Sequence, residues 1–153
     1  MIRRVTSDDA EAVAELSAEL GYPVSPETMR QRIAELISIN DRVVFVACSA
    51  EGKVVGWIDI AITNHLQAEP RAEIGGLVVS SHVRSKGIGR SLMAHAEEWA
   101  ARRGVNKMLV RSRVAREQAH RFYEREGYAR IKTSIVFEKE ICHEPCYPVP
   151  PAS

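Results

Sequence analysis

The sequence has no long hydrophobic run, few cysteines and almost no net charge, and each of these shortages excludes a class of protein. No segment approaches the roughly 20 apolar residues that cross a bilayer, and the first ten residues lack the apolar stretch of a secretory signal. The 21 basic and 20 acidic residues leave a net charge of +1, too little for an overall field that attracts nucleic acid or an anionic membrane. We therefore expect a cytoplasmic protein with neither a nucleic-acid partner nor a membrane partner.

The three cysteines indicate neither a disulfide framework nor a metal site. Cys48 falls in a segment typical of a core strand, whereas Cys142 and Cys146 lie near the end of the chain. The sequence CHEPC at 142–146 offers three potential zinc ligands, but a structural zinc site needs a fourth ligand and a folded scaffold. We expect no metal.

What remains is the composition of one folded domain. The chain has 153 residues, of which 45% are apolar and 27% charged, and a chain of this length buries roughly 70% of the surface that its unfolded state exposes. Four of the seven prolines fall between Pro145 and Pro151. We predict a folded domain over residues 1–141 and a flexible tail over residues 142–153.

The hydrophobic pattern predicts strands and helices in mixed order. Ser7 and Asp8 are expected to cap the first helix and Ser25 the second, and residues 63–70 are expected to form a loop. We predict strands at 2–6, 42–49, 54–62, 71–79, 106–112, 128–131 and 133–141, and helices at 7–20, 25–39, 88–103 and 116–127. Helices interspersed among strands favour an α/β (α+β) fold with a mixed sheet covered by helices.

A basic, glycine-rich loop joins a central strand to the third long helix. The amides that open a helix have no internal partner, and the helix dipole adds about half a positive charge there. Gly87 and Gly89 leave the backbone accessible, while Arg84, Lys86 and Arg90 bring cations to the same point. The loop is therefore predicted to bind phosphate; an exposed helix start with solvated basic side chains is the alternative.

The loop does not match the common nucleotide-binding motifs. A dinucleotide motif G-x-G-x-x-G would need glycine where Leu92 stands, and an acidic residue about twenty positions further on, where Lys107 is found. The P-loop sequence G-x-x-x-x-G-K-[ST] is absent from the chain. The loop is therefore expected to bind a phosphate-containing ligand other than those that these two motifs recognise.

Two motifs resemble the GNAT superfamily of N-acetyltransferases. The sequence VVSSHVRSKGIGRSL at 78–92 resembles its motif A, [RQ]-x-x-G-x-[GA], through Arg84, Gly87 and Gly89. The sequence AHRFYEREGY at 119–128 is similar to the family pattern A-x-x-[FL]-Y-x-x-x-G-[FY]. The likeness covers roughly residues 1–141 and implies the GNAT fold, a mixed, mostly antiparallel, twisted sheet of about seven strands flanked by about four helices.

The resemblance implies an enzyme that transfers an acetyl group from acetyl-CoA to a primary amine by direct attack, without metal. The acceptor is left open among a small amine, an amino acid, an antibiotic and a protein amine. The implied coenzyme-binding residues are Leu77, Val78, Val79, Arg84, Ser85, Lys86, Gly87, Ile88, Gly89, Arg90, Arg116 and Tyr123. Ser85 and Arg116 depart from the family pattern, which often has glycine and asparagine at these positions.

The resemblance also suggests the catalytic residues. Tyr123 would be the general acid, unless it is simply a helix core residue, and Glu73 would be the general base, unless it merely pairs with Arg71. His65, Glu69 and an ordered water are the other candidates for the base.

Four arginines at and after the strand predicted at 106–112 have two interpretations. Arg111, Arg113, Arg116 and Arg121 either form a solvated basic face or bind the 3′-phosphate of the coenzyme or a carboxylate of the acceptor.

Two broader questions stay open from the sequence. A non-catalytic acyl-CoA-binding regulatory module would keep the same loop, and a structural protein could carry it without using it. The closing strands over 128–141 could pair their edges between subunits, which would make a homodimer.

Overall fold

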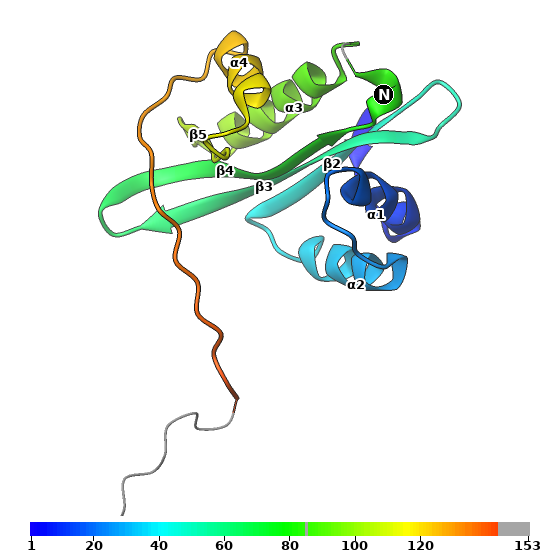
Figure 1. Ribbon diagram of the computed structural model, residues 1–153, viewed down its shortest axis with the longest axis horizontal. Helices are drawn as coiled ribbons and strands as arrows, with labels where there is room; N and C mark the ends of the chain where they lie inside the picture. Colours follow the sequence, from blue (N-terminus) through cyan, green and yellow to red (C-terminus); the bar gives the residue numbers. More distant parts are fainter. Residues whose placement is uncertain (85, 144–153) are drawn as a thin grey trace, which may run out of the picture. The chain divides into compact units, whose positions relative to one another are not determined.

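The computed structural model describes residues 1–84 and 86–143, which divide into two units, Met1–Arg113 and the part that begins at Val114. Ser85 and residues 144–153, most of the predicted tail with Cys146, lie outside the described part. In chain order the elements are β1 (Ile2–Arg4), η1 (Ser7–Asp9), α1 (Ala10–Glu19), α2 (Pro26–Leu36), β2 (Arg42–Cys48), β3 (Val54–His65), β4 (Ala68–Val79), η2 (Ser81–Val83), α3 (Ile88–Arg102), β5 (Met108–Val110) and α4 (Glu117–Arg125) (Figure 1). Over these described residues, no helix has the length and apolar character that crossing a membrane requires.

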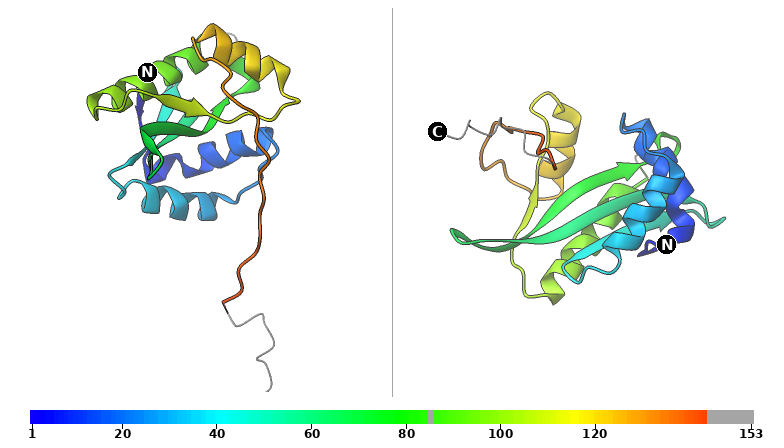
Figure 2. Two further views of the ribbon diagram at one scale, coloured as in Figure 1. Left: turned by 90° about the vertical axis from the view of Figure 1, so that its left-hand side faces the viewer. Right: turned by 90° about the horizontal axis from the view of Figure 1, so that it is seen from below.

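The first unit is built on a five-stranded sheet. The strands lie in the order β1-β2-β3-β4-β5, with antiparallel neighbours from β1 to β4 and a parallel pair at β4 and β5. Helices α1 and α2 cover one face of this sheet and α3 covers the other (Figures 1 and 2). The predicted mixed, mostly antiparallel sheet covered by helices is confirmed.

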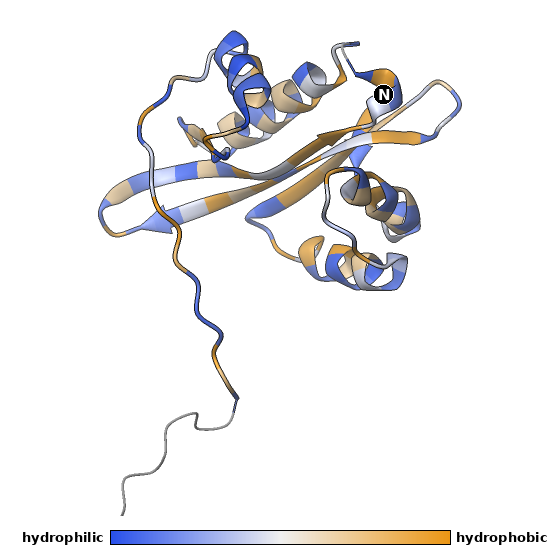
Figure 3. Cartoon of the chain, in the orientation of Figure 1, coloured by the Kyte–Doolittle hydropathy of each residue, from blue (hydrophilic) through white to orange (hydrophobic). Residues whose placement is uncertain are grey.

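Apolar side chains fill the space on both faces of the sheet. Val13 and Leu16 of α1 and Ile33 of α2 pack with Val46 and Val78 of the sheet in one buried cluster. On the other face α3 buries its apolar stripe, Leu92, Met93, Ala96, Trp99 and Ala100. The middle strands are correspondingly hydrophobic over much of their length (Figure 3).

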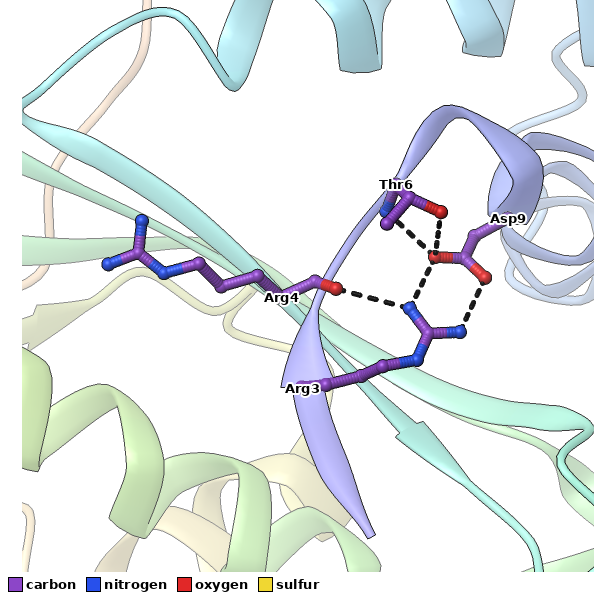
Figure 4. A network of polar contacts seen from close by, with 4 residues as sticks. All are labelled: Arg3, Arg4, Thr6 and Asp9. Carbon is purple, nitrogen blue, oxygen red and sulfur yellow. Dashed lines mark hydrogen bonds and ion pairs between the residues drawn. The ribbon is translucent and has the colours of Figure 1, made fainter.

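One of the two predicted helix caps is confirmed and the other is wrong. The Ser25 hydroxyl accepts the N–H of Thr28 at 3.1 Å at the start of α2, as predicted. At the first helix a short 3₁₀ turn comes before α1, and the capping box joins Thr6 and Asp9 rather than starting at Ser7 and Asp8 (Figure 4). The helix start is fixed at Asp9 because the Arg3 guanidinium of β1 binds the same carboxylate at 2.8 Å.

The predicted loop over 63–70 is mostly strand. β3 and β4 continue to pair through Thr63 with Arg71 and His65 with Ala68, which leaves a turn at 66–67. The segment contains Asn64 and Pro70, which are unfavourable in strands, but the long antiparallel neighbour overrides this local preference.

The predicted strands at 128–131 and 133–141 are wrong. Residues 128–143 form neither helix nor strand, so the described sheet has five strands rather than about seven. β-branched residues favour an extended backbone, but a strand forms only where a neighbour takes up its backbone hydrogen bonds. Within the described chain the Tyr128 N–H bonds the Tyr123 carbonyl at 2.9 Å, and no backbone pairing follows it.

Gly76 holds a close contact between β4 and β3. A Cβ at this position would lie 2.8 Å from Cη2 of the Trp57 ring, nearer than real Cβ atoms approach. Gly76→Ala is therefore expected to lower the free energy of unfolding by about 1–3 kcal/mol through overpacking, measured by urea denaturation. Gly52→Ala, in the open β2–β3 turn, would test the contribution of backbone strain alone, because its φ is +82° and nothing lies within 4 Å of the added Cβ. Equal losses in the two variants would contradict the steric explanation.

Candidate active site

The glycine-rich loop ends in an uncapped helix start. Gly87 is the N-cap of α3 with φ 78° and ψ 9°, a left-handed conformation that suits glycine, and it makes no side-chain capping bond. The N–H groups of Ile88, Gly89 and Arg90 open the helix, and its first turn contains no acidic residue. Exposed Lys86 lies directly before Gly87. Backbone donors, the positive end of the helix dipole and a nearby cation together favour an anion here.

The strand that leads to this loop has an open edge. β5 pairs with β4 over Ala72–Ile74 and, within the described residues, pairs with nothing beyond Ile74. The Ser80 N–H donates to the Val55 carbonyl of β3 at 2.8 Å. Since successive residues of a strand direct their backbone N–H and C=O groups to opposite edges, the backbone groups of Leu77 and Val79 face the open edge.

The open edge suits an extended ligand segment next to the anion site. Arg84 donates from Nε to the Val79 carbonyl at 3.5 Å, a long bond that another partner could replace. Val78 directs its backbone to β3 and its side chain is 3% exposed, so the available contacts come from Leu77 and Val79. A phosphate on the helix amides and an amide-containing chain along this edge would fit coenzyme A.

Glu73 lies on the same strand, on the sheet face that α1 and α2 cover. Its carboxylate accepts the Nε–H of Arg111 at 2.8 Å, and its side chain is 23% exposed. The partner is thus Arg111 on the segment after β5, and not the neighbouring Arg71. Within the described residues this ion pair engages Oε1, and no side chain is hydrogen-bonded to Oε2.

The other base candidates lie further from the coenzyme loop. Glu73 is six residues before Val79 on β4, roughly 20 Å along an extended strand, whereas Glu69 is ten residues away, roughly 33 Å. His65 lies across the turn from Ala68 at the far end of the hairpin. Position along the strand therefore favours Glu73 among these three residues.

Three contributors to this region could not be recognised from the sequence. The Tyr22 hydroxyl, from the segment between α1 and α2, accepts a hydrogen bond from Arg113 at 3.3 Å. The Trp57 indole N–H and the Ser112 hydroxyl are buried and have no hydrogen-bond partner in the described structure. Such groups are usually satisfied in proteins, which makes them candidates for ligand contacts.

The second unit contains Tyr123 on α4. Its ring contacts Phe122 at 5.3 Å and Tyr128 at 6.1 Å between centroids, and burial raises the pKa of the phenol while the nearby charge of Arg116 opposes this effect. A raised pKa keeps the phenol protonated, as a general acid requires. The four arginines divide between the units, with Arg111 and Arg113 in the first and Arg116 and Arg121 in the second, where Arg121 pairs with Glu117 at 3.8 Å.

Known proteins with similar sequences are acetyltransferases. The chain is 33% identical over 129 residues to an aminoalkylphosphonate N-acetyltransferase of Salmonella typhimurium, a match that covers 83% of each protein. It is 26% identical over 140 residues to a type 1 aminoglycoside N(6')-acetyltransferase of Stenotrophomonas maltophilia, which covers 89% of this chain and 90% of that one.

A solved structure shares the fold. The aminoglycoside acetyltransferase AAC(6')-Iy, in complex with the bisubstrate analogue CoA-S-monomethyl-acetylneamine, superimposes with a TM-score of 0.80 at 19% identity and covers 92% of this chain and 98% of that one. The sequence model of the acetyltransferase (GNAT) family matches residues 10–128, which include both the glycine-rich loop and the Tyr123 motif. The chain belongs to the acetyltransferase (GNAT) family.

Proposed function

We propose that the protein is a cytoplasmic N-acetyltransferase that moves the acetyl group of acetyl-CoA to the primary amine of a small acceptor. The observation that carries the proposal is the open edge of β4 at Leu77 and Val79, which leads into the uncapped start of α3 at Gly87. Acetyl-CoA would supply the activated acyl group as a thioester. The residues of the chain would hold it and manage the protons of the transfer.

The acceptor needs a base before it can attack. An amine with a pKa near 10.4 is neutral in about one molecule in a few thousand at pH 7, a scarcity worth roughly 4.6 kcal/mol. We assign this proton to the Glu73 carboxylate, directly or through water, while Arg111 is bound to Oε1. The neutral amine nitrogen then bonds to the acetyl carbonyl carbon as the carbon–sulfur bond breaks, and the proton that the new amide nitrogen loses replaces the one that Tyr123 gives to the sulfur.

Tyr123 would donate its proton to the departing sulfur. A phenol of pKa about 10 is protonated at neutral pH and can share its proton with the sulfur as the carbon–sulfur bond breaks, although full transfer to a free thiolate of ordinary pKa about 8.5 is uphill by roughly 2 kcal/mol. No covalent acyl-enzyme is required, and the buried Cys48 takes no part.

The acceptor class is suggested by Arg113 and by the relatives. The Arg113 guanidinium lies beside Tyr22, which is on the segment between α1 and α2, and its planar shape suits a carboxylate or phosphonate. The named acceptors of the relatives are aminoalkylphosphonates and aminoglycosides. We therefore rank a small amine that carries an acidic group as the first candidate acceptor. The test measures the release of free thiol from acetyl-CoA in the presence of aminoalkylphosphonates, amino acids, aminoglycosides and amine-bearing peptides. Tight coenzyme binding without turnover on any acceptor would instead support a regulatory module.

Coenzyme binding can be tested with two matched glycine variants. Gly87 and Gly104 have φ of +78° and +75°, and nothing lies within 4 Å of a Cβ added at either position. Both alanine variants should therefore lose a similar 1–2 kcal/mol of stability through left-handed strain. Because one charge-assisted hydrogen bond is worth about 1.5–3 kcal/mol, Gly87→Ala should also weaken coenzyme binding by tenfold or more.

A thermal shift titration with acetyl-CoA gives the readout. In the wild type and in Gly104→Ala, coenzyme at 100 times its dissociation constant should add about 2.7 kcal/mol of stability, and in Gly87→Ala much less at the same concentration. Equal stabilisation of both variants would contradict the placement of the pyrophosphate at this helix start.

We also propose that the protein is a homodimer. The exposed apolar residues of the second unit and the near-zero net charge support association between copies. Static light scattering at micromolar concentration measures the mass directly.

A further inference from the structure

A cavity lies at the end of the first unit's sheet that is far from the coenzyme loop. Its volume is about 500 Å³, within the roughly 300–1,000 Å³ that is usual for small-molecule sites. The lining comes from the end of β1, from η1, from the segment between α2 and β2, from the start of β2 and from Arg103. At this end Arg42 of β2 pairs with Ala61, whereas Val79, which leads to the coenzyme loop, pairs with Gly56. None of the lining residues belongs to β3, β4 or the coenzyme loop, so the cavity is separate from the candidate active site.

Three arginines from different elements line this cavity. Arg4 ends β1, Arg42 begins β2 and Arg103 follows α3. Asp8 is the single acidic residue among the described residues of the lining. Because a guanidinium presents five N–H donors and no acceptor, three of them against one carboxylate favour an anionic ligand.

Arg4 and Arg42 keep donors that the fold does not use. The Arg4 side chain makes no hydrogen bond or ion pair within the described residues, and it extends away from the Arg3–Asp9 pair (Figure 4). Arg42 binds both carboxylate oxygens of Asp59, at 2.7 and 2.8 Å, but through Nη2 alone. Its Nε is buried and has no hydrogen-bond partner in the described structure. The charge of Arg42 is therefore balanced, but most of its donors are still available to a ligand.

Arg103 is held in position by contacts that leave it accessible. Its guanidinium lies 4.8 Å from the centre of the Trp99 ring and donates to Asp41 at 3.3 Å. The Asp41 side chain is 62% exposed, and an ion pair that is open to water contributes little. Neither Asp41 nor Asp59 lines the cavity, so both carboxylates are directed elsewhere.

The rest of the lining is largely apolar. Val5, Val43 and Val44 are buried, and Ile37 and Ile39 are 57% and 44% exposed. An inorganic ion would leave the two isoleucines in contact with water. An organic anion would also cover this apolar surface, which is favourable in proportion to the area removed from water.

We propose that this cavity, here called the arginine cavity, binds a small organic anion, namely a carboxylate or a phosphate monoester that carries an apolar group. The anionic group would accept hydrogen bonds from Arg4, Arg42 and Arg103, and the apolar group would cover Ile37 and Ile39. The inference does not rest on acetyl transfer, because the arginine cavity shares no residue with the candidate active site.

An NMR titration of the isotope-labelled, full-length protein with phenyl phosphate tests the proposal. Saturable shifts should appear at the amides of residues 4–8 and 36–44, and they should persist when acetyl-CoA is present in excess. Arg4→Gln should weaken the binding about tenfold or more, because it removes a charge-assisted partner of the anion. Arg30→Gln is the matched control, since Arg30 is exposed on α2 and does not line the cavity.

Three further compounds define the class of ligand. Inorganic phosphate should bind about tenfold more weakly than phenyl phosphate, because it buries no apolar surface. Ile37→Ser should weaken the binding of phenyl phosphate and leave that of inorganic phosphate unchanged. Benzylamine, a cation of similar size, should not bind, and the relative affinities of benzoate and phenyl phosphate identify the preferred anionic group.

Other outcomes would overturn the proposal. Shifts at residues 86–92, or shifts that acetyl-CoA abolishes, would place the anion at the coenzyme loop. Equal affinity of Arg4→Gln and Arg30→Gln would indicate a general effect of surface charge, and equal affinity for inorganic and phenyl phosphate would remove the role of the isoleucines. Without saturation by either aromatic anion there is no such site. Circular dichroism of each variant confirms that it is folded before its affinity is interpreted.

Discussion

Replacing Tyr123 by phenylalanine is expected to lower kcat by about 10²- to 10⁴-fold, the usual contribution of a positioned general acid. The substitution removes one hydroxyl and keeps the ring that packs against Phe122 and Tyr128. The phenol makes no hydrogen bond within the described structure, so its loss should leave folding and acetyl-CoA affinity nearly unchanged. The measurement is steady-state kinetics with the best acceptor, together with a coenzyme titration.

The pH profile gives this experiment a second readout. Burial raises the pKa of Tyr123 above its ordinary value of 10.0, so the acid form persists through neutral pH and is lost only above that range. The wild-type kcat should therefore fall at high pH, and this limb should be absent from Tyr123→Phe. Tyr128→Phe is the matched control, because Tyr128 lies in the same aromatic cluster and has no assigned role in the chemistry. Equal kcat in the two phenylalanine variants would remove Tyr123 from the mechanism.

Local sequence signals predicted the parts of the fold that depend on local physics. Ser25 followed by Pro26 predicts the start of α2, because both act within one turn. The β-branched residues of 42–49 and 54–62, joined by a short turn, likewise predict the β2–β3 hairpin. The glycine-rich loop was recognisable for the same reason, since Gly87 needs only its own left-handed backbone and the helix that follows.

The failures have a common cause in partners that are distant along the chain. The loop predicted at 63–70 became strand because each of β3 and β4 supplies the other with hydrogen bonds, and the strands predicted at 128–141 did not form because no strand of the described chain pairs with them. Glu73 was correctly placed on a central strand, but its partner Arg111 is 38 residues away. A side chain's type can be read locally, but its neutralising partner depends on the folded topology.

Asp9 shows how much such a distant partner can contribute, and Asp9→Asn is expected to lower the free energy of unfolding by about 2–4 kcal/mol at pH 7. The Asp9 side chain is 7% exposed, and its carboxylate binds both terminal nitrogens of Arg3 at 2.8 Å (Figure 4). The amide would keep the shape of the side chain but would leave the guanidinium without its counter-charge. Removing one partner of a buried pair costs about 3–5 kcal/mol, and the value is reduced here because the Arg3 side chain is 36% exposed.

The loss should depend on pH with a definite sign. The Arg3 guanidinium, and the Thr6 N–H that donates to the same carboxylate at 2.8 Å, hold the pKa of Asp9 below its ordinary value of 3.8, although burial opposes them. A lowered pKa stabilises the fold above the ordinary value, and this contribution disappears as the pH falls through the native pKa. Urea denaturation should therefore separate wild type from Asp9→Asn at pH 7 and bring the two together well below pH 4.

The neighbouring aspartate provides the control for this effect. Asp8 is exposed and makes no ion pair in the described residues, so Asp8→Asn should change the free energy of unfolding by no more than about 0.5 kcal/mol. If Asp8→Asn and Asp9→Asn lost the same stability, or if the Asp9→Asn loss persisted unchanged at low pH, the ion pair with Arg3 would not be its source. A large loss confined to Asp9 and to neutral pH would instead show that the β1 arginine, and not the predicted cap at Ser7 and Asp8, fixes the start of the first helix.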